Sequence, residues 1–209
     1  IILFENKIKK YSFFKKEFIK AIDKKIEKKV FSSIEKSYKH KMPFTTIENE
    51  INDVFKKNDY KILKPTSRKS KNLRFVDSIK NTLYDKMVKD DSIILMGQDI
   101  GEYGGVFKIT EGFLKKFGKH RIINTPITES GIIGAAMGLS IEGFKPVVEM
   151  QFADFVSVGF NQIVNNLAKT YYRWGQPINV TLRMPTGAGI GAGPFHSQSN
   201  ESWFFHVPG

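Results

Sequence analysis

Four short apolar segments, separated by longer segments with helical patterns, constrain the fold of residues 75–209 more than any other feature. The predicted strands are SIILMG, RIINT, PVVEM and INVTLR, at residues 92–97, 121–125, 146–150 and 178–183. Helices are predicted before and between them, at residues 75–88, 111–118, 129–141 and 154–173. Strands that alternate with helices build a parallel sheet. The sequence therefore predicts an α/β fold, an open parallel sheet with helices on both faces, and Asp154 as the cap of the last helix.

A helical segment precedes this domain. Seven side chains recur at steps of four, with lysines between them: Phe14, Phe18, Ile22, Ile26, Val30, Ile34 and Tyr38. They predict an amphipathic helix or helix pair whose winding stripe needs a partner surface. Binding to a membrane surface is a weaker interpretation, because acidic residues interrupt the basic face. TTIENEINDVF predicts a short acidic turn and helix, and the polar basic segment 56–74 predicts a linker. We thus expect a helical segment 1–55, a linker 56–74 and a domain 75–209.

The positive charge of the chain is concentrated in its first third. The net charge is +12; residues 1–71 contain 20 Lys and Arg against 9 Asp and Glu, and residues 72–209 contain 13 against 12. Lysine outnumbers arginine 28 to 5, although arginine is the better reader of phosphates and bases. We therefore interpret the lysines as solvated surface and expect no nucleic-acid partner. A basic arm that binds an acidic partner stays open as a non-enzymatic alternative.

Three further features bound the class of protein. The absence of cysteine excludes disulfides, thiolate metal sites and a thiol nucleophile. No run approaches the roughly 20 apolar residues that cross a bilayer, and the N-terminal residues do not follow a secretory signal pattern. We therefore expect a soluble, cytoplasmic protein without a membrane partner. Because the chain begins at Ile1 and stops at Gly209, we also expect it to be part of a longer polypeptide.

The predicted helix 129–141 is the first candidate for chemistry. Glu129 stands at its start, and four small residues recur along it at steps of three and four: Gly131, Gly134, Ala135 and Gly138. A helix face without side chains lets another backbone or a ligand approach closely, which offsets about 1 kcal/mol of helix propensity for each glycine. Tight packing on the sheet is the plain alternative. For Glu129 the alternative is an ordinary acid stabilised by the helix dipole.

The second candidate is GAGIGAGPFHSQS, residues 187–199. Its glycines satisfy the pattern G-x-G-x-x-G/A of dinucleotide sites, but Pro194 blocks the helix that would bind the phosphates. A glycine loop that delivers His196 to a site fits better, because an imidazole titrates in the range suited to proton transfer. A purely structural histidine stays open. The other histidines have no comparable setting, and no spacing indicates a metal site.

Residues 72–209 resemble the beta subunit of the thiamine-diphosphate-dependent E1 component of 2-oxo acid dehydrogenase complexes. Four motifs in the family's order carry the resemblance: MGQDIGEYGGVFKITEGF, RIINTPITESGIIGAAMGLSIEGFKPVVEMQFADF, NQIVNNLAKTYY and HSQSNESWFFHVPG. The resemblance implies that family's pyrimidine-binding domain, without the beta subunit's C-terminal domain. FENKI and the helices that end in ENEINDVF resemble the tail of the family's alpha subunit more weakly. The chain is thus expected to span the junction of a fused alpha-beta polypeptide.

The resemblance also implies roles for four residues. The acid at the position of Glu129 binds N1′ of the cofactor's aminopyrimidine and promotes its imino tautomer, which takes the proton from the thiazolium ring. Phe155 matches an aromatic residue against the pyrimidine, and Ile127 matches an apolar residue two positions before the glutamate. His196 matches a histidine at the mouth of the site that assists acyl transfer to the lipoyl group. A single carboxylate suffices because the cofactor itself does the proton transfer and holds the resulting carbanion.

The implied partners follow from the family as well. They are an E1 alpha region, a second protomer in a heterotetramer or fused homodimer, the lipoyl domain of E2 and a 2-oxo acid, with branched-chain substrates slightly favoured over pyruvate. The diphosphate and Mg²⁺ are held by a G-D-G motif of the alpha part, which this chain lacks, so we expect no metal ligands here and no activity from this chain alone. A relative of transketolase or deoxyxylulose-phosphate synthase is the enzymatic alternative. It would need phosphate-binding residues at the mouth, where only Arg183 and His196 are candidates.

Overall fold

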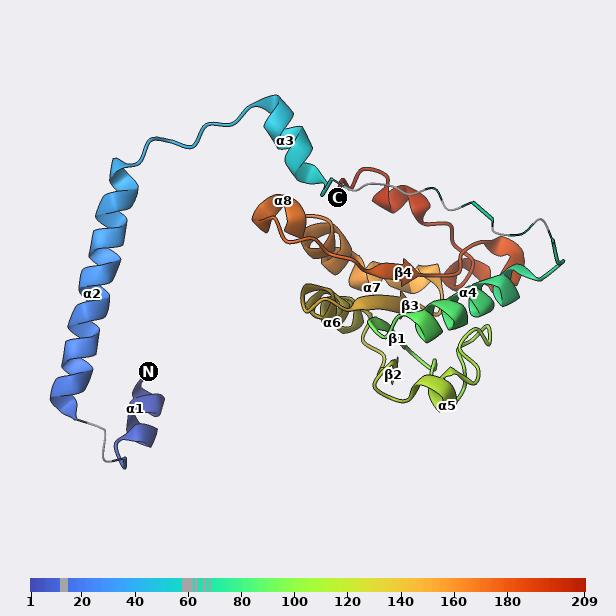
Figure 1. Cartoon of the computed structure of the whole chain (residues 1–209), viewed down its shortest axis with the longest axis horizontal. Helices are drawn as coiled ribbons and strands as arrows, with labels where there is room; N and C mark the ends of the chain where they lie inside the picture. The colour runs from blue at the N-terminus through green and yellow to red at the C-terminus, as the bar shows by residue number, and fades with distance from the viewer. Residues whose placement is uncertain (12–14, 58–61, 63, 66, 68) are drawn as a thin grey trace. The chain divides into compact units, whose positions relative to one another are not determined.

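The computed structural model describes residues 1–11, 15–57, 62, 64–65, 67 and 69–209. It divides into two compact units, Ile1–Thr45 and Thr46–Gly209. The first consists of helix α1 (Ile2–Ile8) and helix α2 (Lys16–Lys39) (Figure 1), so the predicted helix pair is confirmed. Phe14 lies outside the described residues. Neither helix has a buried residue, so no other described part of this unit covers the apolar stripe of α2.

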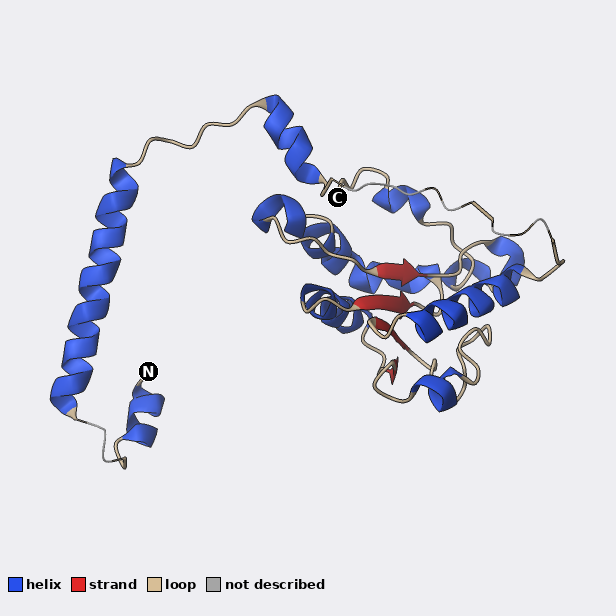
Figure 2. Ribbon diagram, viewed as in Figure 1, coloured by secondary structure: helices blue, strands red, loops and turns tan. Residues whose placement is uncertain are grey.

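The second unit is built on a four-stranded sheet. Its strands are β1 (Ile93–Gly97), β2 (Ile122–Asn124), β3 (Lys145–Glu149) and β4 (Thr181–Arg183). Their order is β2-β1-β3-β4, and every neighbouring pair is parallel (Figure 2). The predicted open parallel sheet is therefore confirmed. All four strands end at the same edge of the sheet, because parallel strands point the same way.

Two apolar clusters lie on opposite faces of this sheet, as the alternation of side chains along β1 requires. Ile93 and Leu95 pack with residues of α4 (Phe75–Lys89) and α5 (Phe113–Phe117). Ile94 and Met96 pack instead with α6 (Glu129–Ile141). All five residues of β1 are buried. The prediction of helices on both faces is confirmed, and the predicted bounds of the helix at 129–141 match α6.

Strand β4 is shorter than predicted. Its register with β3 begins at the pair Val147 and Thr181, whereas the apolar pattern extends the strand back to residue 178. The reason is that the backbone N–H of Asn179 donates to the hydroxyl of Ser140, at 2.6 Å. This hydrogen bond ties the segment before β4 to the end of α6, so the segment does not join the sheet.

The prediction of one regular helix at residues 154–173 is wrong, because the helical structure of this segment is interrupted. The chain forms four successive pieces: η1 (Ala153–Phe155), α7 (Val156–Asn161), a wider π-helical turn η2 (Gln162–Leu167) and α8 (Thr170–Trp174). At the junction of η2 and α8 the hydroxyl of Thr170 donates to the carbonyl of Asn166, which competes with the regular helical pattern. Asp154 is not a helix cap either: it lies inside η1, and its Oδ1 accepts a hydrogen bond from the N–H of Gln198 at 3.2 Å.

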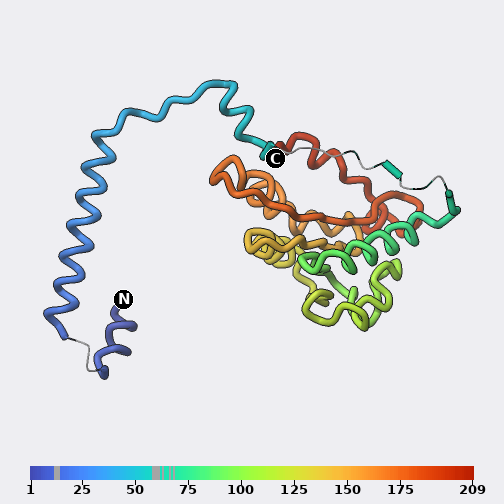
Figure 3. Tube along the Cα trace, in the orientation of Figure 1, coloured from blue at the N-terminus to red at the C-terminus, as the bar shows by residue number. Residues whose placement is uncertain are grey.

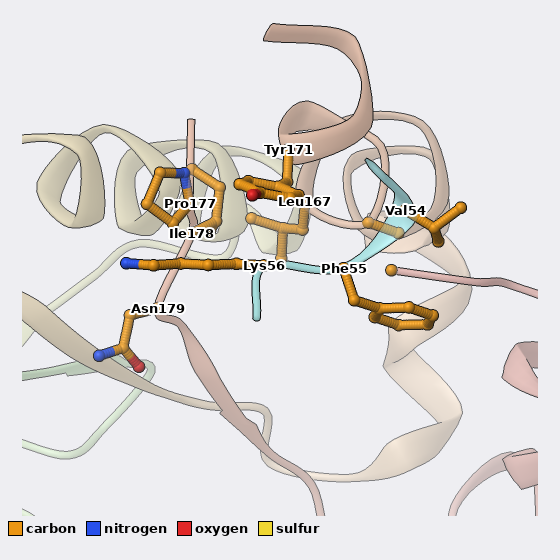
Figure 4. A pocket seen from close by; sticks show the side chains of 10 residues that line it. Val54, Phe55, Lys56, Leu167, Tyr171, Pro177, Ile178 and Asn179 are labelled. Carbon is orange, nitrogen blue, oxygen red and sulfur yellow. The ribbon is translucent and has the colours of Figure 1, made fainter. Parts of the chain in front are cut away.

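Helix α3 (Ile47–Val54) belongs to the second unit. Thr46 caps it by accepting a hydrogen bond from the N–H of Asn49 at 3.2 Å, which confirms the predicted turn and helix. The Tyr172 hydroxyl of α8 donates to the Glu50 carboxylate of α3, and this contact raises the pKa of Tyr172. Beside the contact, a cavity of about 400 Å³ lies between the end of α3, Tyr171 and Asn179 (Figure 4).

After β4 the chain forms a loop and then runs back towards the end of α3, as the trace in Figure 3 shows. In this part of the described chain, the regular structure consists of three short 3₁₀ turns, at Ala188–Ile190, Gly193–Phe195 and Glu201–Phe204. Among the described residues, no helix combines the length and the apolar character that a membrane crossing requires.

Candidate functional site

The candidate residues lie just beyond the carboxyl ends of the strands, where parallel α/β sheets place their ligands. Gln98 follows β1, and Glu129 begins α6 after β2. Phe155 follows β3 in η1, and His196 lies in the loop after β4. Each strand of the sheet thus contributes one side chain to the same edge, from positions far apart in the sequence.

Glu129 is a buried carboxylate with one hydrogen-bond donor. It is 8% exposed, and the side-chain amide of Gln98, also 8% exposed, donates from Nε2 to Oε1 of Glu129 at 3.2 Å. No described residue donates to the second oxygen. Its place in the first turn of α6 stabilises a negative charge, because the helix N–H groups face it. The arrangement leaves one carboxylate oxygen able to accept a hydrogen bond from a ligand.

Helix α6 is held close to α7 beneath this carboxylate. A Cβ atom added to Gly159 of α7 would lie 2.4 Å from Cδ1 of Ile133 and 3.7 Å from the carbonyl oxygen of Glu129. A side chain at this position would force the buried Ile133 side chain to shift. Because α7 directly follows η1, the same contact fixes Glu129 relative to the segment that carries Phe155.

The glycines of α6 do not serve to pack it on the sheet. A Cβ atom added at Gly138 would meet no atom within 4 Å, and one at Gly134 would meet only the side chain of Gln162, at 3.9 Å. Packing on the sheet, one of the two alternatives, is therefore wrong for these two positions. Their face of the helix stays accessible to another chain or to a ligand.

His196 and Phe155 are in direct contact through an aromatic cluster. The imidazole lies edge-on to Phe155, with ring centroids 5.4 Å apart, and edge-on to Phe152, with centroids 4.9 Å apart. Phe152 also contacts Phe155 at 5.8 Å and Phe107 at 5.9 Å. Edge-to-face contacts of this kind are favourable for aromatic rings. These contacts hold the half-buried imidazole beside Phe155, the residue whose ring the resemblance places against the pyrimidine of the cofactor.

Ile127 stands apart from these contacts. It lies two residues before Glu129 and is 83% exposed, so the chain itself does not cover its side chain. An isoleucine this exposed carries an apolar surface that a ligand or another subunit can bury. The structure therefore brings Phe155 and His196 together and leaves Ile127 outside their cluster.

Sequence reasoning missed three features of this edge of the sheet: two single residues and one ion pair. Gln98 follows a strand without any periodic signal, and Phe152 stands in the motif QFADF beside the residue that was chosen. The third is an ion pair at the ends of β3 and β4, where Nη2 of Arg183 donates to Oε2 of Glu149 at 2.8 Å. Glu149 and Arg183 lie opposite each other in the register of β3 and β4, and this pairing of opposite charges is the signal from which the ion pair could have been predicted.

The loop of residues 187–199 closes on itself at its base. The hydroxyl of Thr186 donates to the carbonyl of Gln198 at 2.7 Å, and the N–H of Gly187 donates to the same carbonyl at 3.3 Å. Pro194 lies in a single 3₁₀ turn. Among the described residues, histidines and acids do not gather in groups of three or more that could hold a metal ion.

Comparison with known proteins assigns this domain to a family. The family model described as "Transketolase, pyrimidine binding domain" matches residues 71–209. The chain is 42% identical over 139 residues to 2-oxoisovalerate dehydrogenase subunit beta of Pseudomonas aeruginosa, covering 66% of this chain and 40% of the relative. It is 43% identical over 142 residues to 3-methyl-2-oxobutanoate dehydrogenase subunit beta of Mycobacterium tuberculosis, covering 67% and 41%.

Relatives named for a different substrate match nearly as well. The pyruvate dehydrogenase E1 component subunit beta of Leifsonia xyli is 40% identical over 139 residues, covering 66% of this chain and 41% of the relative. The chain thus spans about two fifths of the length of these curated relatives. With the matched region, the parallel sheet and the buried glutamate at its edge in agreement, the chain belongs to the transketolase pyrimidine-binding domain family.

Proposed function

We propose that this chain supplies the pyrimidine side of a thiamine diphosphate site in the E1 component of a 2-oxo acid dehydrogenase. The observation that carries the proposal is the buried carboxylate of Glu129, which has one oxygen held by Gln98 and the other without a described donor. The beta-subunit relatives support it, since they match this chain over 139 and 142 residues, and the family model matches residues 71–209.

The residues present fit an aminopyrimidine. A buried carboxylate with a free oxygen accepts a hydrogen bond from a protonated ring nitrogen, and burial strengthens such a bond by excluding water. The ring of Phe155 and the exposed apolar surface of Ile127 provide contacts for a flat aromatic ligand. When bound, thiamine diphosphate supplies the carbon nucleophile that attacks the 2-oxo group and the electron sink for decarboxylation. Glu129 would hold the proton at the pyrimidine nitrogen.

His196 would act mainly in the second half of the reaction. Its imidazole is held by Phe152 and Phe155 at the same edge of the sheet as Glu129. A histidine can donate or accept a proton near neutral pH. We assign it to substrate handling and to the transfer of the acyl group to a lipoyl domain of E2.

The remaining parts of the site would come from other regions. We propose that an E1 alpha region binds the diphosphate through Mg²⁺, and that residues 1–55 are the tail of that region in a fused alpha-beta chain. A second protomer would complete the site. The sugar-phosphate alternative is less well supported, because Arg183, one of its two candidate phosphate ligands, is already paired with Glu149.

For the substrate we propose a branched-chain 2-oxo acid rather than pyruvate, on the basis of QFADF and TYYRWG. The relatives are named for both substrates, so kinetics must decide. We expect kcat/KM in the assembled enzyme to be higher for 3-methyl-2-oxobutanoate than for pyruvate. The opposite order would refute the substrate assignment and leave the reaction class unaffected.

The reaction itself is tested with Glu129→Gln in the assembled enzyme that contains this chain. We expect kcat/KM for the 2-oxo acid to fall by the equivalent of about 2 to 4 kcal/mol, with thiamine diphosphate binding largely kept in calorimetry. Glu142→Gln is the matched control, because Glu142 caps the opposite end of α6 and is exposed. Unchanged turnover in Glu129→Gln would refute the role of this residue.

A further inference from the structure

The loop that carries His196 is attached to η1 at both of its ends. At its start, the carbonyl of Pro185 accepts a hydrogen bond from the N–H of Ala153 at 2.8 Å. At its end, the N–H of Gln198 donates to Oδ1 of Asp154 at 3.2 Å, and Nδ2 of Asn200 donates to the carbonyl of Ala153 at 3.0 Å. Two adjacent residues of η1 therefore bind the chain on both sides of the histidine.

The polar side chains of this attachment are buried. Asp154 is 8% exposed and Asn200 is 3% exposed, and neither Oδ2 of Asp154 nor Oδ1 of Asn200 has a hydrogen-bond partner in the structure. Burying a carboxylate and an amide with unmet hydrogen-bonding capacity opposes folding. Apolar side chains would fill these positions at lower cost. Asp154 and Asn200 are therefore better explained by the loop that they attach to η1 than by a contribution to the stability of the fold.

The loop itself needs such an attachment. Four of its residues are glycines, at positions 187, 189, 191 and 193, and a Cβ atom added to any of them would meet nothing within 4 Å. A glycine-rich segment with so few packing contacts has a large conformational entropy to lose when it is ordered. Gln198, two residues after His196, is where the loop closes, because its carbonyl accepts from Thr186 and Gly187.

We propose that Asp154 is a positioning residue which, together with Asn200, holds His196 in contact with the rings of Phe152 and Phe155. Asp154 lies next to Phe155 in η1, so one short segment carries the aromatic ring and binds the loop that brings the imidazole to it. The inference rests on the proposed role of His196 in acyl transfer. Asp154 acts through the Gln198 N–H and does not take part in the chemistry.

The first test does not depend on activity. In the assembled enzyme, Asp154→Ala should accelerate hydrogen–deuterium exchange in peptides that cover residues 186–199, whereas peptides that cover β1 and β3 should exchange as in the wild type. Asp154→Asn keeps a side-chain oxygen that can accept the Gln198 hydrogen bond, so it should restore most of the protection. Glu201→Ala is the matched control, since Glu201 is an exposed acid that lies just after the loop of residues 187–199. Unchanged exchange of residues 186–199 in Asp154→Ala would overturn the proposal.

The second test separates the two half-reactions. Asp154→Ala should slow acyl transfer to a free lipoyl domain roughly tenfold or more, the effect expected for losing a hydrogen bond to a charged group. Reduction of an artificial electron acceptor with the same 2-oxo acid should fall far less. Asp154→Ala combined with His196→Ala should be no slower than His196→Ala alone. Equal losses in both assays, or additive losses in the double variant, would contradict a positioning role.

Asn200→Ala provides an independent variant if Asp154→Ala does not assemble. It removes the hydrogen bond to Ala153 and should produce the same faster exchange and the same selective loss of acyl transfer; wild-type behaviour in both assays would overturn the proposal. A wild-type enzyme that oxidises no 2-oxo acid would refute the proposed function. The exchange experiment would still decide whether Asp154 holds the loop.

Discussion

The imidazole of His196 lies edge-on to the ring of Phe155, with centroids 5.4 Å apart and ring planes at 81°. The two side chains come from segments after different strands, β4 and β3, which are neighbours in the sheet. Their contact depends on the parallel register of those strands, which ends at the ion pair between Glu149 and Arg183. The sheet therefore brings the two segments that carry the histidine and the aromatic ring to the same edge.

Replacing His196 should impair acyl transfer more than decarboxylation. We expect His196→Ala to lower the rate of lipoyl-domain acylation by about 100-fold, the usual scale for removing a general acid or base. Reduction of an artificial electron acceptor should fall far less. His206→Ala is the control, because His206 is exposed. Wild-type acylation by His196→Ala would remove this residue from the mechanism.

Gln98→Leu tests the hydrogen bond that orients Glu129. Leucine fills a similar volume but cannot donate, so the buried carboxylate loses its one described donor. A hydrogen bond to a charged group contributes about 1.5–3 kcal/mol, and we expect kcat/KM for the 2-oxo acid in the assembled enzyme to fall roughly 10- to 100-fold.

The matched control for Gln98 is Gln151→Leu. Gln151 is also a glutamine that follows a strand of this sheet, but its Nε2 donates to Asp99 rather than to Glu129. It should turn over the 2-oxo acid nearly as the wild type does. Equal losses of kcat/KM in the two variants would mean that the Gln98 effect is not specific to Glu129.

Local sequence patterns predicted the elements whose packing does not depend on particular distant residues. The apolar run of β1 indicates a strand buried on both faces, and all five of its residues are buried. The bounds of α6 follow from its apolar and small residues, between a polar start and the turn at Gly143. Such features are encoded within a few residues, so they can be inferred from the sequence without knowing the tertiary contacts.

Long-range hydrogen bonds account for the errors. Asp154 before an apolar stretch is typical of a helix cap, yet its partner is the N–H of Gln198, far along the chain. The start of β4 shifts to Thr181 because Asn179 binds Ser140. At the site, Glu129 and His196 were chosen by resemblance. Gln98 was missed because its importance comes only from the carboxylate that it contacts.

Gly159→Ala tests the close approach of α6 and α7. Alanine favours a helix over glycine by about 1 kcal/mol, but its Cβ would lie 2.4 Å from Cδ1 of Ile133, which is 1% exposed. Overpacking a core costs about 1–3 kcal/mol, so we expect a net loss of stability in urea unfolding.

Ile133→Val removes the clashing Cδ1 atom and should rescue Gly159→Ala. The valine variant alone should cost about 0.5–1.5 kcal/mol. The double variant should be more stable than the sum of the two single effects predicts, because valine leaves room for the new methyl group. Simple additivity of the two free-energy changes would show that this contact does not limit the approach of the helices.

Asp90 should make the stability of the second unit depend on acid pH. Nζ of Lys145 donates to Oδ2 of Asp90 at 2.6 Å, and Ser92 donates to Oδ1 from both its hydroxyl and its N–H. These hydrogen bonds, that of Lys145 first, hold the pKa of Asp90 well below its usual range. The unfolded chain has an Asp pKa of about 3.9. Because the folded pKa is the lower one, this contribution is fully present above about pH 5 and is lost as the pH falls from there towards the folded pKa.

The measurement is the melting temperature of the wild type and Asp90→Asn between pH 7 and pH 2. The wild type should melt higher by a constant margin above about pH 5. The margin should shrink below about pH 4, because the unfolded chain then binds a proton at Asp90 while the folded carboxylate, with its lowered pKa, stays ionised. Asp85→Asn is the matched control, because Asp85 is an exposed acid of the same helix, and it should show no such trend. A margin that persists unchanged to pH 2 would mean that the ionised form of Asp90 contributes nothing beyond its neutral hydrogen bonds.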